Sequence, residues 1–543
     1  SIFFIVKEYE IVYNIKRDEV IYMYYLDTNI PLKQFKMDIA SEPYVDKSLL
    51  IDKLNSFIRT RNRFICITRP RRFGKTMNAT MLGAYYTQGY DAHDLFKNLK
   101  IAQTTSYEKH INKHHVFYID FSRMPDYCDS YRTYIDSIMK TIKEDLMNIY
   151  PKLSEKSYDY LYQMFLDTND SFIFIMDEWN SIFYKDFMQE KDKKAYLEFL
   201  KGLLKDQSYV ELAYMTGVLP IAKYSGGSEL NMFKEYNFMN DRIYEDYFGF
   251  DEEEIVELTK KYTKPSFETL KKWYDGYYKS DGSSLFNPRS VSSAITDGVC
   301  LNYWTETGPM DEIAEYIEHN VDAVREDIVK MVAGIPIRVK LKGYSASDLR
   351  LNSRDEILSA MVVFGFLSYH NGYLRIPNFE LMEKFEATLE RKSMGGVAEV
   401  VENSEKILEE TINGNAEKVA EMIELAHDKE IPFIQYNDEN SMSCLITLCY
   451  LKARDDYEVT REDKSGKGYV DFLFKPKNYG DPAIILELKY DKNAQEAINQ
   501  IKEKNYIEKV KNVRECLLVG INYDKKNKEH TCIIEKMIQE VYE

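Results

Sequence analysis

Short hydrophobic runs alternate with amphipathic stretches through the first third of this 543-residue chain. Four runs have the length and apolar content of buried β-strands, and they cover residues 63–68, 116–121, 172–177 and 210–216. Residues 127–167 carry apolar side chains at i, i+3 and i+4, the spacing of helices that bury one face. Strands that alternate with helices predict an α/β domain with a mostly parallel sheet and crossover helices.

The pattern changes after Asp251. From there to about residue 340 it predicts charged, amphipathic helices with no clear strands. Residues 346–378 then predict a helix, a short apolar segment at 362–367 and a turn at Asn371-Gly372. This order of helices and hairpin is compatible with a winged helix.

A second helical stretch, residues 384–427, precedes another α/β pattern. Strands are predicted at residues 470–474, 484–488 and 516–520, and a helix is predicted between the second strand and the third. A Gly-Asp-Pro turn separates the first two strands. A module of this length has the size of an independent domain.

Composition limits the choice of function. The hydrophobic fraction of 44% is ordinary for a globular protein, and the formal net charge is −17. An acidic balance argues against a nucleic-acid binder held by bulk charge, although an enzyme with one local basic groove is compatible with it. Charged residues interrupt the apolar segment at residues 1–27, so neither a membrane span nor a secretory signal is predicted.

The cysteines and histidines predict no metal site. The seven cysteines contain no CxxC pair, and the eight histidines show no metal-binding spacing. This usage favours a reduced, cytoplasmic protein.

The first predicted strand runs into Phe73-Gly74-Lys75-Thr76, and a helix-forming stretch follows at residues 77–86. This is the layout of a phosphate-binding loop. Backbone N–H groups at the helix N-terminus face the phosphates, the lysine neutralises the β- and γ-oxygens, and the threonine hydroxyl reaches Mg²⁺. The match to G-x-x-x-x-G-K-[ST] is imperfect, because Arg69 occupies the position of the first glycine.

A phosphate-binding loop needs an acidic partner that holds the Mg²⁺ shell. Asp177 ends a hydrophobic strand, and Glu178 follows it in a position to polarise water. Together with the loop, these residues predict ATP binding. Thr216 ends the fourth strand, where it could present a polar sensor to the γ-phosphate or could be an ordinary transition from strand to loop.

Three arginines have open roles. Arg71 and Arg72 lie beside the phosphates, where they could neutralise charge or bind a partner strand. Arg242 could be an arginine finger or sensor, or a plain surface residue.

Several short motifs, taken in order, resemble the AAA-ATPase-like family of predicted bacterial ATPases. They are residues 44–48, 69–76, 177–178, 216–219, 273–277, 286–290 and 303–304. In that family the pattern Arg-Pro-Arg-Arg-Phe-Gly-Lys replaces the usual first glycine, so Arg69 conforms to the family. The resemblance covers roughly residues 37–380. It implies an ASCE-type P-loop ATPase core followed by a helical and winged-helix-like region.

Two acids of the C-terminal module lie on its first two predicted strands. Asp471 and Glu487 are 16 residues apart (487 − 471), and a hairpin would bring both carboxylates to one side. Lys489 shares the face of Glu487 because strand side chains alternate. Two carboxylates can hold a hard divalent cation such as Mg²⁺, and a nearby ammonium group positions the nucleophile or stabilises charge.

Charges at a strand edge could also give this pattern, but its context resembles the PD-(D/E)XK nuclease superfamily. Glu439 lies on an upstream helix where the superfamily places its first acid, and Gln500 lies on the following helix where a glutamine recurs. The resemblance implies a restriction-endonuclease-like α/β domain, commonly fused behind an AAA-ATPase-like core, with Mg²⁺ or Mn²⁺ at Glu439, Asp471 and Glu487. Family members often read Gly-Arg-x-Asp, whereas Tyr469 occupies the basic position here, which weakens phosphate contact without removing metal binding.

The sequence therefore predicts an ATPase coupled to a Mg²⁺-dependent nuclease that acts on nucleic acid, most simply DNA, with a homo-oligomer as a further option and no membrane partner. Glu178 would serve ATP hydrolysis, and Asp471, Glu487, Lys489 and Gln500 would serve cleavage. The expected divisions are an extension (1–36), the ATPase domain (37–250), the helical region (251–400) and the nuclease-like domain (401–543).

A nucleotide-dependent switch is the alternative. In it, ATP binding would order an oligomer or recruit a partner, and the nuclease-like domain would only bind nucleic acid. The acidic net charge and Tyr469 favour this reading modestly. A basic groove around Asp471 would favour the nuclease, and an acidic or occluded one would favour the switch.

Overall fold

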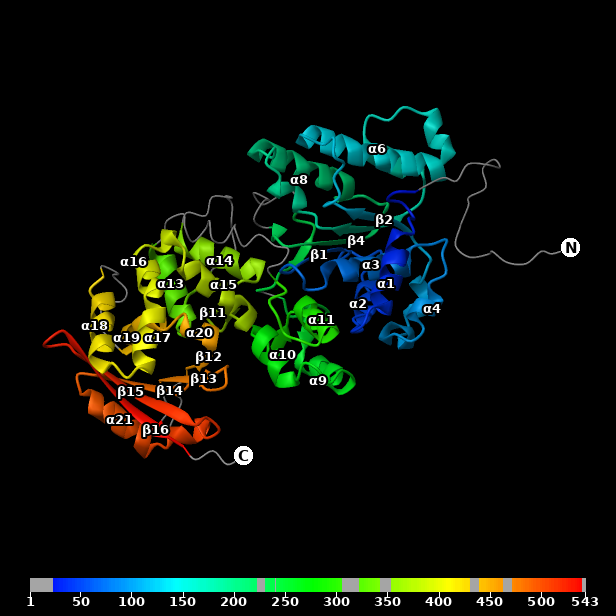
Figure 1. The fold of residues 1–543 in the computed structure, drawn as a ribbon. Coiled ribbons are helices and arrows are strands. Elements are labelled where there is room, and N and C mark those ends of the chain that lie inside the picture. The colour runs from blue at the N-terminus through cyan, green and yellow to red at the C-terminus, as the bar shows by residue number, and fades with distance from the viewer. Residues whose placement is uncertain are drawn as a thin grey trace. The chain divides into compact units, whose positions relative to one another are not determined.

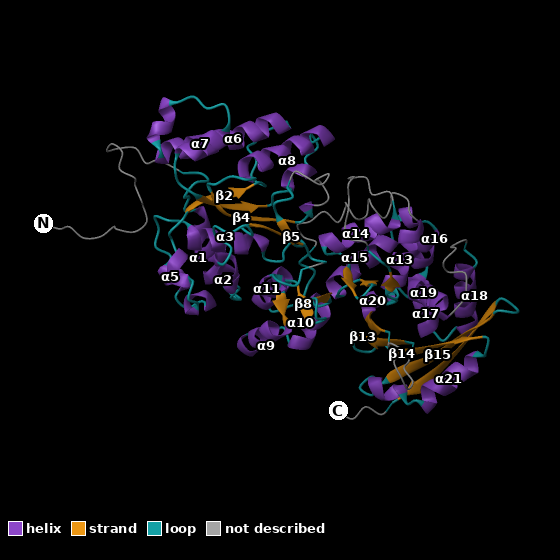
Figure 2. Ribbon diagram, turned by 180° about the vertical axis from the view of Figure 1, so that it is seen from behind, coloured by secondary structure: helices purple, strands orange, loops and turns teal. Residues whose placement is uncertain are grey.

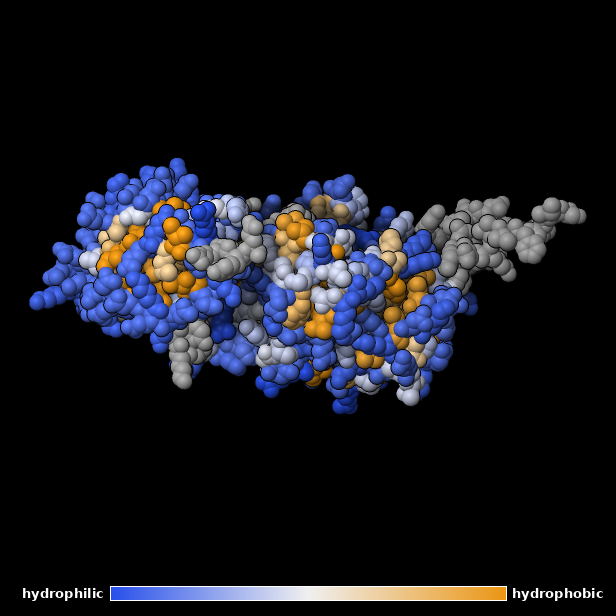
Figure 3. Space-filling view, turned by 60° about the horizontal axis from the view of Figure 1, so that its bottom comes forward, coloured by the Kyte–Doolittle hydropathy of each residue, from blue (hydrophilic) through white to orange (hydrophobic). Residues whose placement is uncertain are grey.

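The computed structural model describes residues 23–221, 230–239, 241–304, 322–341, 353–429, 439–461 and 471–539 (Figure 1). The chain divides into two compact units. The first comprises Ser1–Gly308, Lys340–Gly372 and Pro377–Glu380, and the second comprises Pro309–Val339, Tyr373–Ile376 and Leu381–Glu543. Within the described part of the chain, no helix combines the length and the apolar character needed to cross a membrane. The face drawn in Figure 3 is largely hydrophilic, with apolar patches among the polar side chains.

A parallel five-stranded sheet forms the core of the first unit, in the order β2-β3-β4-β1-β5. Its strands are β1 (Phe64–Thr68), β2 (His115–Asp120), β3 (Phe172–Asp177), β4 (Val210–Gly217) and β5 (Lys234–Tyr236). The first four confirm the predicted strands, and β5 is too short and too polar to predict. Every residue of β1, β3 and β4 is buried, as expected of strands that are covered on both faces.

Helices cover both faces of this sheet (Figures 1 and 2). Ile65 and Ile67 of β1 pack in the core formed with α1, α2 and α3, whereas Phe64 and Cys66 enter the core formed with α6, α7 and α8. The helices of the first core are α1 (Ile30–Ala40), α2 (Leu49–Asn55), α3 (Lys75–Tyr86), α4 (His93–Phe96) and α5 (Tyr107–His110). Those of the second core are α6 (Tyr131–Ile149), α7 (Leu161–Asp167) and α8 (Glu190–Leu204).

The segment before α1 is anchored to the sheet. Residues 25–27 pair with the edge strand β2 through an antiparallel bridge and two backbone hydrogen bonds. The buried carboxylate of Asp145, on α6, accepts hydrogen bonds from the backbone N–H groups of residues 24–26 at 2.7–3.1 Å. The expected domain boundary at residue 36 falls inside α1, so residues 30–36 belong to the folded core.

The rest of the first unit contains a small antiparallel sheet, which the sequence did not predict. Its order is β6-β8-β7. The elements around it are β6 (Phe250–Asp251), α9 (Glu252–Lys261), α10 (Phe267–Tyr274), β7 (Tyr277–Tyr278), β8 (Ser284–Phe286) and α11 (Pro288–Asp297). The expectation of helices without strands was wrong here, because strands of two or three residues are too short to show an alternating pattern.

The helix predicted near residue 346 is α14 (Arg354–Phe364), and the apolar segment at 362–367 begins in its last turn. Asn371 and Gly372 both have positive φ, 51° and 84°, as a tight hairpin turn requires. They follow β10 (Ser368–His370). The winged-helix assignment stays a prediction.

A mixed five-stranded sheet dominates the second unit, in the order β12-β13-β14-β15-β16. Only the β14–β15 pair is parallel. The strands are β12 (Tyr457–Thr460), β13 (Phe472–Pro476), β14 (Ala483–Tyr490), β15 (Glu515–Asp524) and β16 (Glu529–Ile538). Between β14 and β15 the chain forms α21 (Ala494–Glu503), whose Ile498 and Ile501 pack on the sheet. The predicted strands and helix are confirmed, whereas β12 and β16 were not predicted.

Helices precede this sheet along the chain, as expected for residues 384–427. They are α13 (Asp322–Val332), α15 (Phe379–Leu389), α16 (Gly396–Glu402), α17 (Ser404–Ile412), α18 (Ala416–His427), α19 (Glu439–Cys449) and α20 (Ala453–Asp456). A short antiparallel pair, β9 (Ile337–Arg338) and β11 (Tyr373–Arg375), belongs to the same unit.

Candidate functional sites

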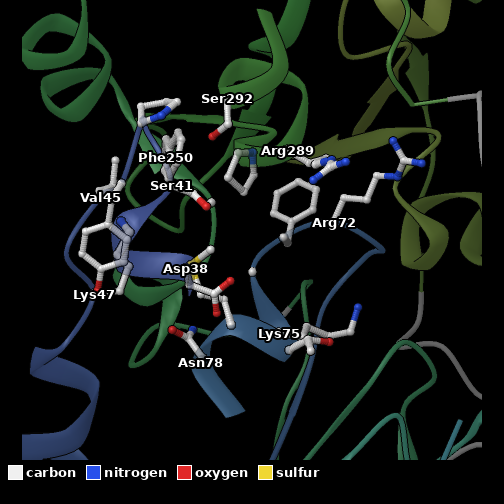
Figure 4. Close-up of a pocket in the computed structure, with 18 of the residues that line it drawn as sticks. Asp38, Ser41, Val45, Lys47, Arg72, Lys75, Asn78, Phe250, Arg289 and Ser292 are labelled. Atoms are coloured by element: carbon white, nitrogen blue, oxygen red, sulfur yellow. The ribbon is translucent and has the colours of Figure 1, made fainter. Parts of the chain in front are cut away.

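The loop between β1 and α3 borders a cavity of about 930 Å³ (Figure 4). Gly74 caps α3 in the left-handed conformation, with φ 84°, so the chain turns directly from the loop into the helix. Residues 71–76 line the cavity, and the first turn of α3 leaves backbone N–H groups without partners inside the helix. Such N–H groups at a helix start suit an anion, and phosphate binding at this loop stays a prediction.

Lys75 lies at this helix start with its side chain 4% exposed. Its Nζ donates a hydrogen bond to the carbonyl of Pro70 at 3.0 Å and lies 3.7 Å from Oε1 of Glu178. The ammonium group therefore already points into the loop, next to the acid that follows β3. A triphosphate in the cavity would compete for these contacts.

Asp177 is buried at the end of β3 and interacts with the side chain of Thr76. Burial, followed by the neighbouring charge of Glu178, raises the pKa of Asp177 to about 7. A divalent cation would offset this unfavourable negative charge, so Thr76 and Asp177 fit the Mg²⁺ of a bound nucleotide.

Arg69 has a structural role instead of a phosphate-binding one. Its buried guanidinium forms an ion pair with Asp241 and donates hydrogen bonds to the carbonyls of Thr68 at 2.8 Å and Tyr236 at 3.0 Å. Asp241 in turn accepts from backbone N–H groups just after it. The residue at the position of the first glycine thus ties the loop to the segment that follows β5.

The other predicted nucleotide-binding residues fall into two groups. Arg71, Arg72, Phe73 and Gly74 line the cavity, although the Phe73 ring itself is buried. Thr216 is buried at the end of β4 and is not among the cavity-lining residues, so its sensor role stays a prediction.

Arg242 is exposed and also lies outside the cavity lining. This position matches the plain surface reading of the residue.

Arg289 also lines the cavity, and the sequence reasoning assigned it no role. It occupies the first turn of α11, where Asn287 caps the helix by accepting from the backbone N–H groups of Arg289 and Ser290. Arg289 and Arg72 lie on the same side of the cavity (Figure 4). Among the described residues Arg289 forms no ion pair, so its charge is available to an anionic ligand. The Asn-Pro-Arg-Ser cap was the available signal in the sequence.

The C-terminal carboxylates meet as predicted. The β13–β14 register pairs Phe472 with Leu486, which places Asp471 opposite Glu487 at the end of the ladder. Oδ2 of Asp471 accepts a hydrogen bond from the backbone N–H of Leu488 at 2.8 Å. The hairpin therefore brings both acids to one side of the sheet.

Lys489 and Gln500 complete this cluster. Lys489 Nζ lies 3.0 Å from Oε1 of Glu487 and donates to Oε1 of Gln500 at 2.7 Å. Gln500, from α21, also donates through Nε2 to Oε1 of Glu487. The four residues predicted from two strands and one helix thus lie together.

Glu487 is 3% exposed, and its Oε2 has no hydrogen-bond partner among the described residues. Burial raises its pKa to about 7, and the charge of Asp471 adds to the shift. A buried carboxylate oxygen left without a donor is costly unless a cation approaches it. The cluster therefore fits a hard divalent cation.

The third predicted metal ligand cannot be placed in this cluster. Glu439 is the first residue of α19, but its side chain lies outside the described part, as does Tyr469. Within the described residues, no group of three His, Cys, Asp or Glu side chains could hold a metal ion.

Together, a parallel sheet with a phosphate-binding loop and a separate carboxylate cluster define a two-domain protein with a P-loop ATPase fold. Family models identify the parts. Residues 31–225 match the AAA-ATPase-like family, described as "Predicted AAA-ATPase", and residues 437–532 match the PD-(D/E)XK nuclease superfamily. The chain is thus a fusion of an AAA-ATPase-like domain with a PD-(D/E)XK superfamily domain. No curated protein matches it in sequence.

Solved structures similar to the chain include two proteins described as ATPases and an ORC2 protein. A Walker-type ATPase of Pyrococcus abyssi has 12% identity and a TM-score of 0.31, over 62% of this chain and 94% of its own. The ORC2 protein of Aeropyrum pernix, in ADPNP-ADP complexes, has 11% identity and a TM-score of 0.31, over 66% and 98%. A signal-transduction ATPase with a tetratricopeptide-repeat sensor from Pyrococcus horikoshii has 12% identity and a TM-score of 0.22, over 76% and 54%.

Proposed function

We propose that this protein hydrolyses ATP and that its C-terminal domain is a Mg²⁺-dependent nuclease that acts on DNA. The observation that carries the proposal is the cluster around Glu487. There, a buried carboxylate, one oxygen of which has no hydrogen-bond partner among the described residues, lies beside Asp471 and the Lys489 ammonium group. A purely structural acid would be satisfied by its hydrogen-bond donors, whereas Oε2 of Glu487 has none within the described part of the chain and suits a cation.

At the nuclease site, each residue has a distinct role. A bound Mg²⁺ or Mn²⁺ would activate water and offset charge on the phosphodiester. Asp471 and Glu487 would hold that cation. Lys489, once released from Glu487, would stabilise the negative charge that develops on the phosphate, and Gln500 would keep the Lys489 ammonium oriented.

At the ATP site, Lys75 would move from the Pro70 carbonyl to the β- and γ-phosphates. Thr76 and Asp177 would hold the nucleotide's cation, and Glu178 would polarise the attacking water. Arg289, from α11, would add a positive charge on the same side of the cavity as Arg72.

The deciding experiment measures cleavage and ATP hydrolysis on the same purified full-length protein. Linear, circular and single-stranded DNA, with an RNA of the same sequence, are incubated with Mg²⁺ or Mn²⁺, with and without ATP. We expect Glu487→Gln to abolish cleavage and to keep ATP hydrolysis. We expect Lys75→Ala to lower ATP hydrolysis by about 100-fold or more.

Glu503→Gln is the matched control for the nuclease site, because Glu503 is an exposed acid on the same helix as Gln500. It should cut like the wild type. Cleavage that survives Glu487→Gln would refute the assignment of the nuclease site. ATP hydrolysis without any cleavage, together with retained DNA binding, would instead support the nucleotide-dependent switch, and light scattering with and without ATP would then test for a homo-oligomer.

A further inference from the structure

Three side chains of the phosphate-binding loop contact the part of the first unit that follows the ATPase sheet. Arg72 donates a hydrogen bond through Nη1 to the carbonyl of Tyr303. The buried ring of Phe73 packs edge-on against Tyr277, with ring centroids 5.2 Å apart. A Cβ added at Gly365 would lie only 2.7 Å from Cβ of Pro70, so the Gly365 backbone fits closely against the loop. The loop is therefore docked through its own side chains.

Glu380 organises the residues that receive the loop. It is fully buried, and its Oε1 accepts hydrogen bonds from the backbone N–H groups of Tyr303 at 2.8 Å and Trp304 at 2.7 Å, and from Oγ of Ser290 at 2.9 Å. Its backbone carbonyl accepts from Nδ2 of Asn302 at 2.7 Å. The side chain of Glu380 thus fixes residues 303–304 and the first turn of α11, and its backbone carbonyl holds Asn302.

Glu380 also interacts electrostatically with Arg72 of the loop. The guanidinium of Arg72 is close enough to favour the ionised carboxylate, against the burial that raises the Glu380 pKa to about 7. A carboxylate removed from water is costly and is retained only where several donors hold it. This carboxylate has three donors, from Ser290, Tyr303 and Trp304, and a nearby cation in Arg72.

The contacts form a continuous path. Glu380 holds the backbone of Tyr303, the Tyr303 carbonyl holds Arg72, and Arg72 has a left-handed φ of 70° two residues before the helix cap at Gly74. A non-glycine residue at such a φ persists only when its surroundings hold it. The contact with Tyr303 supplies that restraint.

We propose that Glu380 is a positioning residue for ATP hydrolysis: through Tyr303 and Arg72 it sets the conformation of the loop that presents Lys75 and Thr76 to the phosphates. This inference rests on the proposed ATPase function. The inference also gives Arg72 a positioning role in place of a mainly phosphate-binding one. Glu380 is also the last residue of the first unit before the chain enters the second.

The test uses full-length protein labelled with 5-fluorotryptophan. The chain has three tryptophans, and Trp304 lies beside Gly365, since its Cη2 would be 3.0 Å from an added Cβ there. Its ¹⁹F signal, assigned with Trp304→Phe, reports on the docked loop. In the wild type we expect this signal to shift when a non-hydrolysable ATP analogue replaces ADP.

We expect Glu380→Gln to lose that shift and to lower kcat for ATP by about tenfold, while KM changes by less than about threefold. Arg72→Met should do the same, and Arg72→Lys should restore part of kcat. Arg72 variants keep the test decisive if Glu380→Gln folds poorly. Glu268→Gln, which changes an exposed acid on α10, is the control and should behave like the wild type.

The outcomes separate the two proposals. If the wild type does not hydrolyse ATP, the proposed ATPase function fails, and the ¹⁹F shift on nucleotide binding still decides whether the loop and Trp304 are coupled. A wild-type kcat and an unchanged shift in Glu380→Gln and Arg72→Met would overturn the positioning role. A rise in KM with kcat unchanged would also overturn it, because Arg72 would then serve nucleotide binding alone.

Discussion

Proton and metal ion should compete for Glu487. With a pKa of about 7, the Glu487 carboxylate is deprotonated in about nine-tenths of molecules at pH 8 and in about one-tenth at pH 6. Because only the ionised carboxylate binds a cation well, the apparent affinity for Mn²⁺ should fall about tenfold between these two pH values. An acid at the ordinary value of 4.5 would be almost fully ionised at both and would give no change.

Calorimetric titration of the full-length protein with Mn²⁺ at pH 8, 7 and 6 measures this directly. ATP is left out so that the nucleotide site does not take up the metal. Glu487→Gln should bind Mn²⁺ weakly at every pH, and Glu503→Gln should keep the wild-type affinity and its pH dependence. Each tenfold step corresponds to about 1.4 kcal/mol of binding free energy.

An affinity that stays constant from pH 8 to pH 6 would refute the reasoning, because it would mean that burial and Asp471 do not hold the Glu487 pKa near neutrality.

Two further predictions concern the stability of the structure around the proposed ATP site. Arg69→Ala should lower the free energy of unfolding by about 3–5 kcal/mol, because it leaves Asp241 buried and unpaired. Arg242→Ala, at an exposed position, should change the free energy of unfolding little. Chemical denaturation compares the two variants, and equal losses of stability would contradict the buried ion pair. Gly217→Ala should cost roughly 1–3 kcal/mol, because the new Cβ would lie 2.1 Å from Oδ1 of Asn180; an unchanged melting temperature would show that this contact relaxes freely.

The sequence predicted the parts of the fold that depend on local pattern. An apolar run such as the first five residues of β3 predicts a buried strand, and a Gly-Lys-Thr run after a strand is typical of a phosphate-binding loop. The Asp471 and Glu487 carboxylates could be paired from strand alternation and one turn. The same reasoning missed β5 and the small sheet around β8, whose strands are too short for any periodicity.

The sequence also could not predict contacts between residues that lie far apart along the chain. Arg69 pairs with Asp241, 172 residues away, and Arg72 contacts Tyr303, 231 residues away. Arg289 reaches the cavity only because α11 folds beside the loop. Such contacts depend on the tertiary fold, so no sequence pattern within one segment predicts them.

The pairing of residues 25–27 with β2 matters for the production of the isolated ATPase-like domain. These residues cover the outer edge of β2, the first strand in the sheet order. A clone that starts at residue 31, where the family match begins, would leave the backbone N–H and C=O groups of that edge open to another molecule. Expression trials should therefore keep residue 24 onward, because shorter clones would be prone to aggregate through strand addition while their ATP site remained intact.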